Sequence, residues 1–397
     1  MQAILLSSYT MTSAIGTGLN PTLAALLAQR GGIACKHWET VDFKTCIGEV
    51  EGLDAYAIRS DLAAFDCRNN RLAQLGLEQD DFTNAVRNAI ERYGKDRVGV
   101  FLGTSTSGIL SSEIAYRHRD PATGKLPEYY DYQHTHNSYS VADFVRSYFD
   151  LRGPAYVVST ACSSSAKVFG SAQRMLASGL IDAAIVGGVD SLCLSTLYGF
   201  NSLQLVSDSP CKPFDAHRDG ISIGEGAAFI LVESTANAMP GDITMTGIGE
   251  SSDAYHMSSP HPEGLGARIA MQAALKMAGL RPSDIDYINL HGTSTLSNDA
   301  AEAKGVAAIF GTQTPCSSTK GHTGHTLGAA GGVEAIICAL ALRHGFAPGG
   351  VGTQEIDPQL TCRYLLANID QTMHHALSNS FGFGGSNCSL VFSRVAA

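Results

Sequence analysis

Short apolar segments alternate along this chain with longer segments that are apolar on one face only. Val98–Leu102, Ala155–Val158 and Ala227–Val232 consist of apolar or small residues, a composition typical of buried strands. Lys167–Ala177 has its apolar residues at helical spacing, which predicts a helix packed on one side. Leu327–Leu342 is weakly polar and rich in Gly and Ala, so it predicts a central buried helix rather than a membrane span. Strands that alternate with helices in this way predict an α/β fold.

Two short patterns occur twice along the chain, in the same order. Gly103–Thr106 reads Gly-Thr-Ser-Thr after a predicted strand, and Gly292–Thr295 repeats it after the apolar run that ends at Leu290. Ser159-Thr160 and Ser318-Thr319 each stand at a turn that opens a helix of small residues. Repeats at strand-to-helix junctions indicate two duplicated halves rich in βαβ units.

The border between these halves is expected near Met239–Asp242, where one predicted strand has ended and another begins at Ile243. We therefore predict an N-terminal half of residues 1–240, which carries the reactive cysteine discussed below, and a C-terminal half of residues 241–397. A chain of 397 residues suits two domains or one two-lobed unit. Residues 117–140, with clustered His, Tyr, Asp and Pro, are expected to form a surface excursion.

Charge and cysteine content narrow the function classes. The net charge is −10 and there is no basic block, which argues against nucleic acid as a partner. The ten cysteines contain no C-x-x-C pair and no Cys/His cluster with metal-ligand spacing. They indicate mostly reduced thiols in a reducing compartment, the cytoplasm. The N-terminus shows neither the basic region nor the long apolar stretch of a signal peptide.

Cys162 stands between the predicted strand Ala155–Val158 and the predicted helix Lys167–Ala177. At such a junction the sulfur points at the helix N-terminus, where free N–H groups and the helix dipole favour the thiolate. The position therefore predicts a nucleophile that needs no metal. An ordinary buried cysteine is the alternative that the segment alone leaves open.

Polar side chains among small residues indicate further candidates for functional residues. His291 follows the end of a predicted strand, where α/β proteins usually carry functional groups, although a histidine hydrogen-bonded in the core fits as well. Lys320, His322 and His325 lie in a glycine-rich turn that feeds the helix Leu327–Leu342. Burying such groups is costly without a task, which favours a functional site.

Two other segments have less decisive patterns. Asn379–Asn387 is a glycine-bracketed aromatic turn, either a plain hairpin or a loop that offers backbone N–H groups to a substrate. Lys212–Gly220, together with Gly224–Gly226, combines charge with glycine. That combination is more typical of a structural ion-pair corner than of a catalytic group.

Taken together, these segments resemble the β-ketoacyl-acyl carrier protein synthases, the elongating condensing enzymes of the thiolase superfamily. The resemblance spans nearly the whole chain, from about Ser13 to the C-terminus. Five motifs occur in the family's order: Thr160–Ser165, Pro213–Gly226, His291–Thr295 with Asn298-Asp299, Ser318–Lys320 with Gly324–Gly331, and Asn379–Gly385.

The resemblance implies a thiolase-like fold of two duplicated halves that form a five-layer α/β/α/β/α core. It implies decarboxylative condensation of an acyl thioester with malonyl-acyl carrier protein, which extends a fatty acyl, polyketide or aryl polyene chain by two carbons. Substrates are expected on the phosphopantetheine of an acyl carrier protein, with no metal or organic cofactor in the enzyme. The expected assembly is a homodimer, or a heterodimer with a chain-length-factor-like homologue.

The resemblance also assigns roles to single residues. Cys162 is the expected nucleophile, and its backbone N–H forms an oxyanion hole with that of Phe383. His291 and His325 are expected to donate hydrogen bonds to the enolate, while Lys320 orients the site. Phe383 is expected to gate the acyl pocket. Supporting roles fall to Thr106 and Phe381 in the acyl pocket and to Glu334 as the structural partner of Lys320.

Some residues depart from the family's usual pattern. Thr106 stands where elongating enzymes often have a larger apolar residue, which suggests a roomier or less apolar tunnel. The serines after Cys162 resemble those of specialised polyketide or aryl polyene pathways. His322 occupies a position that is usually uncharged, and only His325 directly precedes the Thr-Leu-Gly-Ala-Ala-Gly run.

Two other functions compete with this interpretation. A thiolase needs a second cysteine near the C-terminus, and Cys388 follows Gly384–Asn387, but Phe-Gly-Phe-Gly-Gly and His325 match the synthases. A non-catalytic chain-length partner has lost its nucleophile, whereas Cys162 is present here. Whether the chain needs such a partner stays open.

Arg68 and Arg71 lie where the family often places basic residues for the acidic carrier protein. A solvated helix face explains them about as well.

Overall fold

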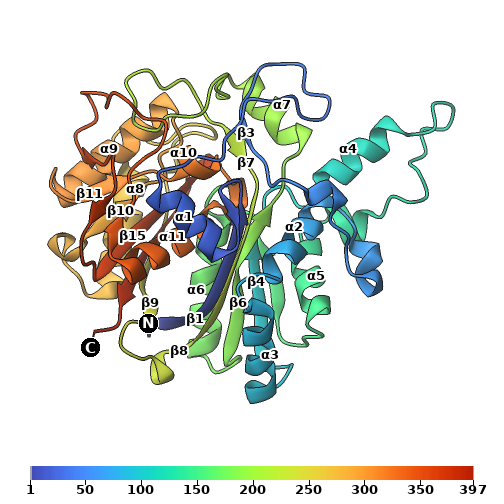
Figure 1. Ribbon diagram of the computed structural model, residues 1–397, viewed down its shortest axis with the longest axis horizontal. Helices are drawn as coiled ribbons and strands as arrows, with labels where there is room; N and C mark the ends of the chain where they lie inside the picture. The colour runs from blue at the N-terminus through green and yellow to red at the C-terminus, as the bar shows by residue number, and fades with distance from the viewer. Residues whose placement is uncertain (1, 397) are drawn as a thin grey trace.

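Two series of strands with the same order make up most of the central sheet (Figure 1). The computed structural model describes residues 2–396 and contains one twelve-stranded sheet. From the centre to one edge, the first series is β1 (Ile4–Ser13), β8 (Gly226–Ser234), β6 (Ala183–Asp190), β4 (Val98–Gly103) and β5 (Ala155–Val158). The second series is β9 (Ile243–Ser252), β16 (Ser386–Arg394), β15 (His375–Gly382), β10 (Tyr287–Asn289) and β11 (Pro315–Ser317), followed by β13 (Arg363–Tyr364).

Strand directions repeat as well. In each series the first three strands are antiparallel neighbours and the last three run parallel. The series meet where β1 pairs with β9, Ile4 opposite Met245. The repeated Gly-Thr-Ser-Thr turns thus follow β4 and β10, which hold equivalent positions. The chain border at about residue 240 stays a prediction, and it falls between β8 and β9.

Short pairings complete the strand set. β2 (Gly16–Thr17) pairs with β1, β3 (Ile47–Gly48) pairs with β7 (Ile223–Gly224), and β12 (Phe346–Ala347) pairs with β14 (Ile369–Asp370).

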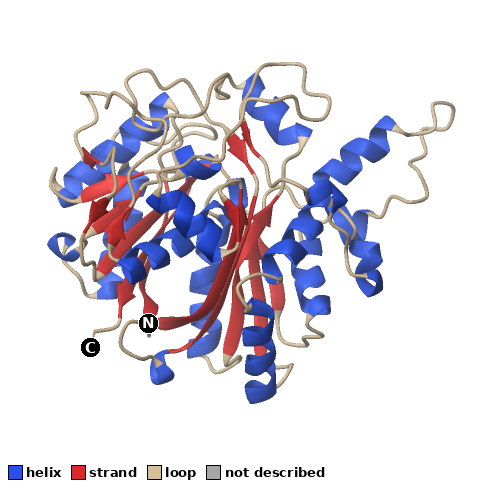
Figure 2. Ribbon diagram, viewed as in Figure 1, coloured by secondary structure: helices blue, strands red, loops and turns tan. Residues whose placement is uncertain are grey.

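Helices lie between the two series and on both outer faces (Figures 1 and 2). The central pair is α6 (Ser164–Ala177) and α11 (Ala330–His344), and α11 packs on β15 as well as on β8 and β6. The outer helices are α2 (Arg68–Leu77), α3 (Phe82–Tyr93) and α5 (Ser140–Tyr148) beside the first series, with α8 (Leu265–Ala278) and α9 (Leu296–Phe310) beside the second. The layers are therefore α/β/α/β/α.

The two central helices approach each other closely. A Cβ at Gly331 would lie 2.7 Å from the Cβ of Ala166, so the contact requires glycine at that point. Residues 330–342 of α11 are all buried, and 89% of the apolar stretch Leu327–His344 is inside the protein. That stretch is the one candidate for a membrane span among the described residues, and its burial agrees with the expected core helix.

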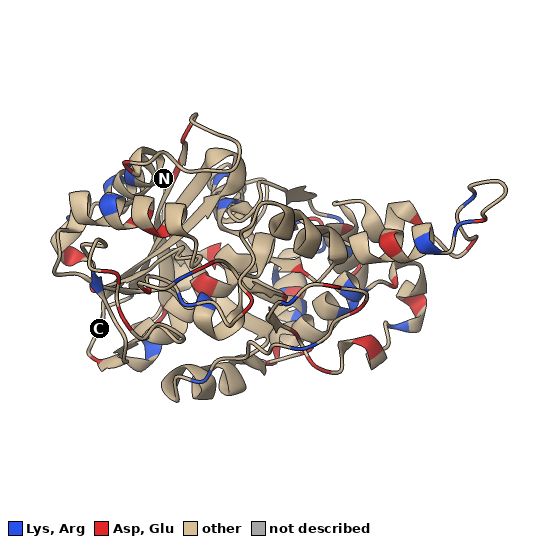
Figure 3. Ribbon diagram, turned by 90° about the horizontal axis from the view of Figure 1, so that it is seen from above, with Lys and Arg blue, Asp and Glu red and all other residues tan. Residues whose placement is uncertain are grey.

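The remaining helices are α1 (Leu19–Leu27), α4 (Ile109–Arg117), α7 (Leu194–Ser202) and α10 (Lys320–Thr323). Beyond α4 the chain forms a protruding arm, residues 118–131, which agrees with the expected surface excursion (Figures 1 and 3). Lys and Arg are scattered among Asp and Glu along the ribbon in Figure 3.

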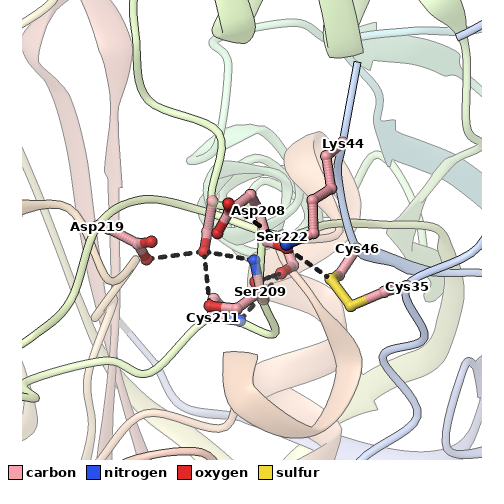
Figure 4. The surroundings of a disulfide bond; sticks show 9 residues. Cys35, Lys44, Cys46, Asp208, Ser209, Cys211, Asp219 and Ser222 are labelled. Atoms are coloured by element: carbon pink, nitrogen blue, oxygen red, sulfur yellow. Dashed lines mark hydrogen bonds and ion pairs between the residues drawn. A yellow bond between two sulfur atoms is a disulfide. The ribbon is translucent and has the colours of Figure 1, made fainter. Parts of the chain in front are cut away.

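The cysteines are mostly reduced, with one exception. Eight are free thiols, and seven of these are buried. Cys35 and Cys46 form a disulfide beside Ser209, Cys211 and Ser222 (Figure 4). Cysteine spacing did not reveal this bond, because two cysteines eleven residues apart become neighbours only through the Ala34–Ile47 backbone bridge.

Candidate active site

A strained turn places Cys162 between β5 and α6. Ala161 has φ 52°, a left-handed conformation that non-glycine residues seldom adopt. Ser163 and Ser164 hold the turn, since their hydroxyls donate to the carbonyls of Thr160 and Ala161 at 2.9 and 2.5 Å. The serines after Cys162 therefore stabilise the turn by hydrogen bonds to its backbone. The Cys162 sulfur faces the second half of the protein.

Both histidines of the predicted set meet Cys162. His325 Nε2 lies 3.0 Å from Cys162 Sγ, and the rings of His291 and His325 are 5.4 Å apart. The Leu327 N–H donates to His325 Nδ1 at 3.2 Å, so the ring hydrogen of neutral His325 is on Nε2. Lys320 Nζ lies 3.4 Å from His291 Nδ1, which likewise leaves Nε2 of His291 as the donor. Two N–H groups are thus available beside the sulfur.

Burial keeps both rings neutral. The pKa of His291 and the pKa of His325 are each held well below the usual 6.5, first by desolvation and then by the nearby Lys320 charge. Neutral rings can donate through Nε2 without placing a second and third cation in the pocket.

Lys320 pairs with Glu334 of α11, and both side chains are almost fully buried. The expected partnership is therefore present as an ion pair. Burial raises the pKa of Glu334 to about 7, although Lys320 opposes that shift. The pair fixes the Lys320 side chain beside His291 Nδ1.

The expected thiolate character of Cys162 is not found in this closed site. Burial raises the pKa of Cys162 to about 11. Lys320 and the backbone N–H groups of Phe383 and Cys162 lower this pKa, but they do not overcome desolvation. The sulfur therefore rests as a thiol. The sequence indicated the helix N-terminus beside Cys162 but not how deeply the sulfur is buried.

The pocket beside Cys162 contains about 580 Å³ of empty space including its mouth. Its lining combines the catalytic candidates with aromatic residues, namely Phe200, Phe381 and Phe383. The ring centroids of Phe200 and Phe383 are 5.3 Å apart, and Phe383 begins a short turn in which Gly384 and Gly385 have φ of 80° and 75°. These left-handed conformations favour glycine at both positions, and the gate role of Phe383 stays a prediction.

Thr106 lies apart from this lining. Its side chain is buried, and its hydroxyl donates to Asp190 Oδ1 at 2.8 Å. The hydroxyl that was expected to make the acyl tunnel less apolar thus has its hydrogen-bond partner inside the protein. The expectation of a less apolar surface at Thr106 needs this correction, while its smaller size remains.

A buried carboxylate that the sequence did not reveal holds His291. Glu302 accepts the backbone N–H groups of His291 and Gly292 at 2.8 and 2.7 Å, and burial raises the pKa of Glu302 to about 7. Its place eleven residues after His291, inside a helix, resembles any helical glutamate. Nothing in the sequence pattern identifies it.

The charged segment after Lys212 is structural, as expected. Arg218 forms an ion pair with Asp357 at 2.7 Å and lies 3.6 Å from Asp299. Asp299 in turn accepts the backbone N–H groups of Phe214 and Thr293. The corner thereby anchors the segment that follows His291.

Arg68 is the clearest correction. Its side chain is 5% exposed and is held by the fully buried Glu225 at 2.6 Å, by Asp54 and by Glu49. A buried, paired arginine offers no surface to a carrier protein, so Arg68 fails as a docking residue. Arg71 is 27% exposed and paired with Asp66, and its docking role stays a prediction.

The ligand atoms of Cys162, His291 and His325 all lie within 4.8 Å of one another, close enough for one metal ion. However, a histidine ligates through a lone pair, and Nε2 of both rings carries the hydrogen in the arrangement described above. The cluster is therefore a better set of hydrogen-bond donors than of metal ligands.

Comparison with known proteins covers almost the entire chain. Residues 2–238 match the family model "Beta-ketoacyl synthase, N-terminal domain", and residues 243–354 match "Beta-ketoacyl synthase, C-terminal domain". Among curated relatives, 3-oxoacyl-[acyl-carrier-protein] synthase 2 of Vibrio cholerae is 32% identical over 407 aligned positions, with 97% of each chain covered.

Two solved structures have closely similar folds. A ketosynthase in complex with its chain length factor, from Xenorhabdus doucetiae, has a TM-score of 0.91 and 38% identity, covering 99% of this chain and 98% of that one. The ishigamide ketosynthase/chain length factor has a TM-score of 0.90 and 25% identity, with full coverage of both chains. These likenesses confirm the thiolase-like fold that the sequence predicted.

Proposed function

Because the chain belongs to the beta-ketoacyl synthase family, we propose that it performs decarboxylative condensation of an acyl thioester with malonyl-acyl carrier protein. The observation that carries this proposal is the position of His325 Nε2, 3.0 Å from Cys162 Sγ, with neutral His291 beside it. A thiol next to two neutral N–H donors suits acyl transfer followed by formation of an enolate.

In the first step, Cys162 Sγ forms a bond to the acyl carbonyl carbon while the carbon–sulfur bond to the carrier's phosphopantetheine breaks. The departing thiolate takes up the proton that the Cys162 thiol loses. Hydrogen bonding from the backbone N–H groups of Phe383 and Cys162 lowers the pKa of the Cys162 thiol, so both groups lie beside the sulfur. They are therefore in place to stabilise the oxyanion of the tetrahedral intermediate.

In the second step, a malonyl thioester on the carrier loses CO₂, and the electron pair of the broken bond becomes an enolate. The Nε2–H groups of His291 and His325 stabilise the enolate oxygen. The enolate carbon then attacks the acyl group on Cys162, and the carbon–sulfur bond to the enzyme breaks. The product is a β-ketoacyl chain two carbons longer, and Cys162 leaves as a thiolate that takes a proton from water.

We assign the chain to a specialised polyketide or aryl polyene pathway. Support comes from the serines after Cys162 and from the 38% identity to a ketosynthase that was solved with a chain length factor. We further propose that the chain works as a dimer, with a chain-length-factor-like homologue as the preferred partner over a second copy. The edge strand β5 supports a dimer, because its four residues are only half-buried and it has one free side.

Two coarser features complete the proposal. The chain is proposed to work in the cytoplasm, with its two halves divided near residue 240. Eight free thiols support a reducing compartment, and the repeated strand order supports the division. Arg71 remains the proposed docking residue for the carrier.

Intact-protein mass spectrometry tests the reaction. The purified chain is mixed with an acyl-carrier thioester and then with malonyl-carrier, beside Cys162→Ala and, as a matched control, Cys388→Ala. We expect acylation of the wild type and of Cys388→Ala, none of Cys162→Ala, and discharge to a β-ketoacyl-carrier product. Condensation that requires Cys388 and releases no CO₂ instead points to a thiolase and contradicts the proposal.

The partner requires a separate measurement. Co-expression with a chain-length-factor-like homologue is expected to give a one-to-one complex by size-exclusion chromatography and faster discharge by malonyl-carrier. Full activity of the isolated homodimer contradicts the proposed heterodimer and leaves the condensation intact.

A further inference from the structure

We propose that Asp190 is a positioning residue that locks His325 in the tautomer with its hydrogen on Nε2. The inference rests on the proposed function, because a locked Nε2–H matters for stabilising an enolate. Asp190 is the last residue of β6 and is fully buried. It belongs to the first half of the chain, whereas His325 belongs to the second.

Six neutral donors converge on the Asp190 carboxylate. Three belong to side chains and three to the backbone: Thr104 Oγ1 at 2.5 Å, Thr106 Oγ1 at 2.8 Å, Ser105 Oγ at 2.5 Å, and the N–H groups of Ser105, Thr106 and Gly328 at 2.9, 2.9 and 2.5 Å. A buried carboxylate ordinarily needs compensation for its lost hydration, and here hydrogen bonds supply it. A carboxylate with this many hydrogen bonds fixes the position of every group that donates to it.

Five of these donors come from one turn, residues 104–106, which follows β4. The sixth, the Gly328 N–H, comes from the short 3₁₀ turn Leu327–Ala329 that precedes α11. A Cβ at Gly328 would lie 2.7 Å from Asp190 Oδ2 and 2.8 Å from the Ser105 nitrogen. The two turns therefore touch backbone to backbone, and Asp190 joins them by the shorter contact, while Ser105 Oγ also accepts the Gly328 N–H at 3.2 Å.

This junction determines the orientation of His325. Leu327 has φ 53°, a conformation that costs energy in a residue with a branched side chain and persists only when its surroundings impose it. The Leu327 N–H is the donor to His325 Nδ1, and the Gly328 N–H is the next one along the chain. By holding Gly328, Asp190 keeps the strained Leu327 amide directed at Nδ1, and the hydrogen of His325 stays on Nε2, facing Cys162.

Replacement of the carboxylate by an amide gives a direct test. In Asp190→Asn one oxygen becomes an NH₂ group, so three backbone N–H donors compete for a single acceptor. We expect discharge of the acyl-enzyme by malonyl-carrier to slow at least tenfold, while acylation of Cys162 changes less than threefold. ¹⁵N NMR of histidine-labelled protein, assigned with His325→Gln, is expected to show His325 as a mixture of tautomers.

Thr104→Val is the matched control, since it removes one side-chain donor and leaves the Gly328 contact. Its expected discharge rate is within threefold of the wild type, with the Nε2–H tautomer unchanged. A second perturbation, Gly328→Ala, presses a methyl group on Asp190 from the opposite side and is expected to reproduce the tautomer mixture. It also provides the test if Asp190→Asn does not fold.

An unchanged His325 tautomer in both Asp190→Asn and Gly328→Ala overturns the inference, as do equal losses in acylation and discharge. The tautomer is read without substrate, so it is independent of the reaction. If wild-type protein with its partner never discharges the acyl group, the proposed function fails while the NMR result still decides the role of Asp190.

Discussion

Lys320→Met tests how charge behind His291 serves the reaction. Lys320 Nζ faces His291 Nδ1 at 3.4 Å and pairs with Glu334. Methionine keeps the length of the side chain and removes its charge. The change takes away the donor that fixes the His291 tautomer, and Glu334 loses its partner.

A hydrogen bond from a charged group contributes about 1.5–3 kcal/mol, which corresponds to about tenfold to 150-fold in rate when it supports a transition state. We expect discharge of the acyl-enzyme to slow by that factor. Acylation slows as well, because Lys320 lowers the pKa of Cys162. The acylation step has a distinct signature, since it requires the Cys162 thiolate and therefore becomes faster as the pH rises.

Single-turnover mass spectrometry between pH 7 and 9.5 separates the two steps. Acylation by Lys320→Met is expected to rise with pH in parallel with the wild type and to stay below it by a constant factor, because both thiol pKa values lie above this range, while discharge stays slow at every pH. The double variant Lys320→Met/Glu334→Gln is the control for an unpaired buried carboxylate, and its melting temperature is expected to recover without recovery of discharge. A normal discharge rate in Lys320→Met refutes the role assigned to Lys320.

Three further predictions follow from the same geometry. The pKa of Cys162, raised to about 11 by burial, leaves roughly one thiol in three thousand ionised at pH 7.5. The rate of iodoacetamide alkylation is therefore expected to rise about tenfold per pH unit up to pH 9.5, with Cys162→Ala giving the background. A plateau of this rate near pH 8 contradicts the prediction. Gly384→Ala adds a methyl into open space at φ 80°, which costs about 1–2 kcal/mol of backbone strain and is expected to slow acylation. Gly179→Ala, with φ 70° and equally open space outside the pocket lining, is the matched control and is expected to lose similar stability without slower acylation. Arg68→Gln leaves Glu225 buried without its charge partner, so the free energy of unfolding, measured in urea, is expected to fall by about 3–5 kcal/mol. The control Arg71→Gln is expected to change it by about 0.5 kcal/mol. An unchanged unfolding midpoint for Arg68→Gln contradicts the assigned pairing.

The reactive residues were predictable because they share a local signature. Cys162, His291 and Lys320 each follow a strand, in turns of small residues. The parallel neighbours β10 and β11 bring the turns of His291 and Lys320 to the same edge of the sheet, whereas Cys162 comes from the other half of the protein. The repeated strand order was predictable for a similar reason, since the two Gly-Thr-Ser-Thr turns stand after equivalent strands.

Groups that act on those residues were not predictable. Asp190 contacts Gly328 across 138 residues, and Glu225 meets Arg68 across 157. Neither contact leaves a pattern in the sequence, and the carrier-docking prediction for Arg68 failed because its side chain is buried. The expectation of a thiolate at Cys162 failed for the same reason, since desolvation depends on everything packed around the sulfur.

The reactive groups lie at the junction between the two halves. The first half supplies the nucleophile and the Asp190 carboxylate, and the second supplies both histidines, Lys320 and the Phe383 turn. Close approach of α6 and α11 at Ala166 and Gly331 brings these sets together without intervening side chains. Because neither half alone holds a thiol beside two locked N–H donors, the chemistry depends on how precisely the halves dock, and Asp190 is the buried hydrogen-bonding group that ties the turn after β4 to the turn beside His325.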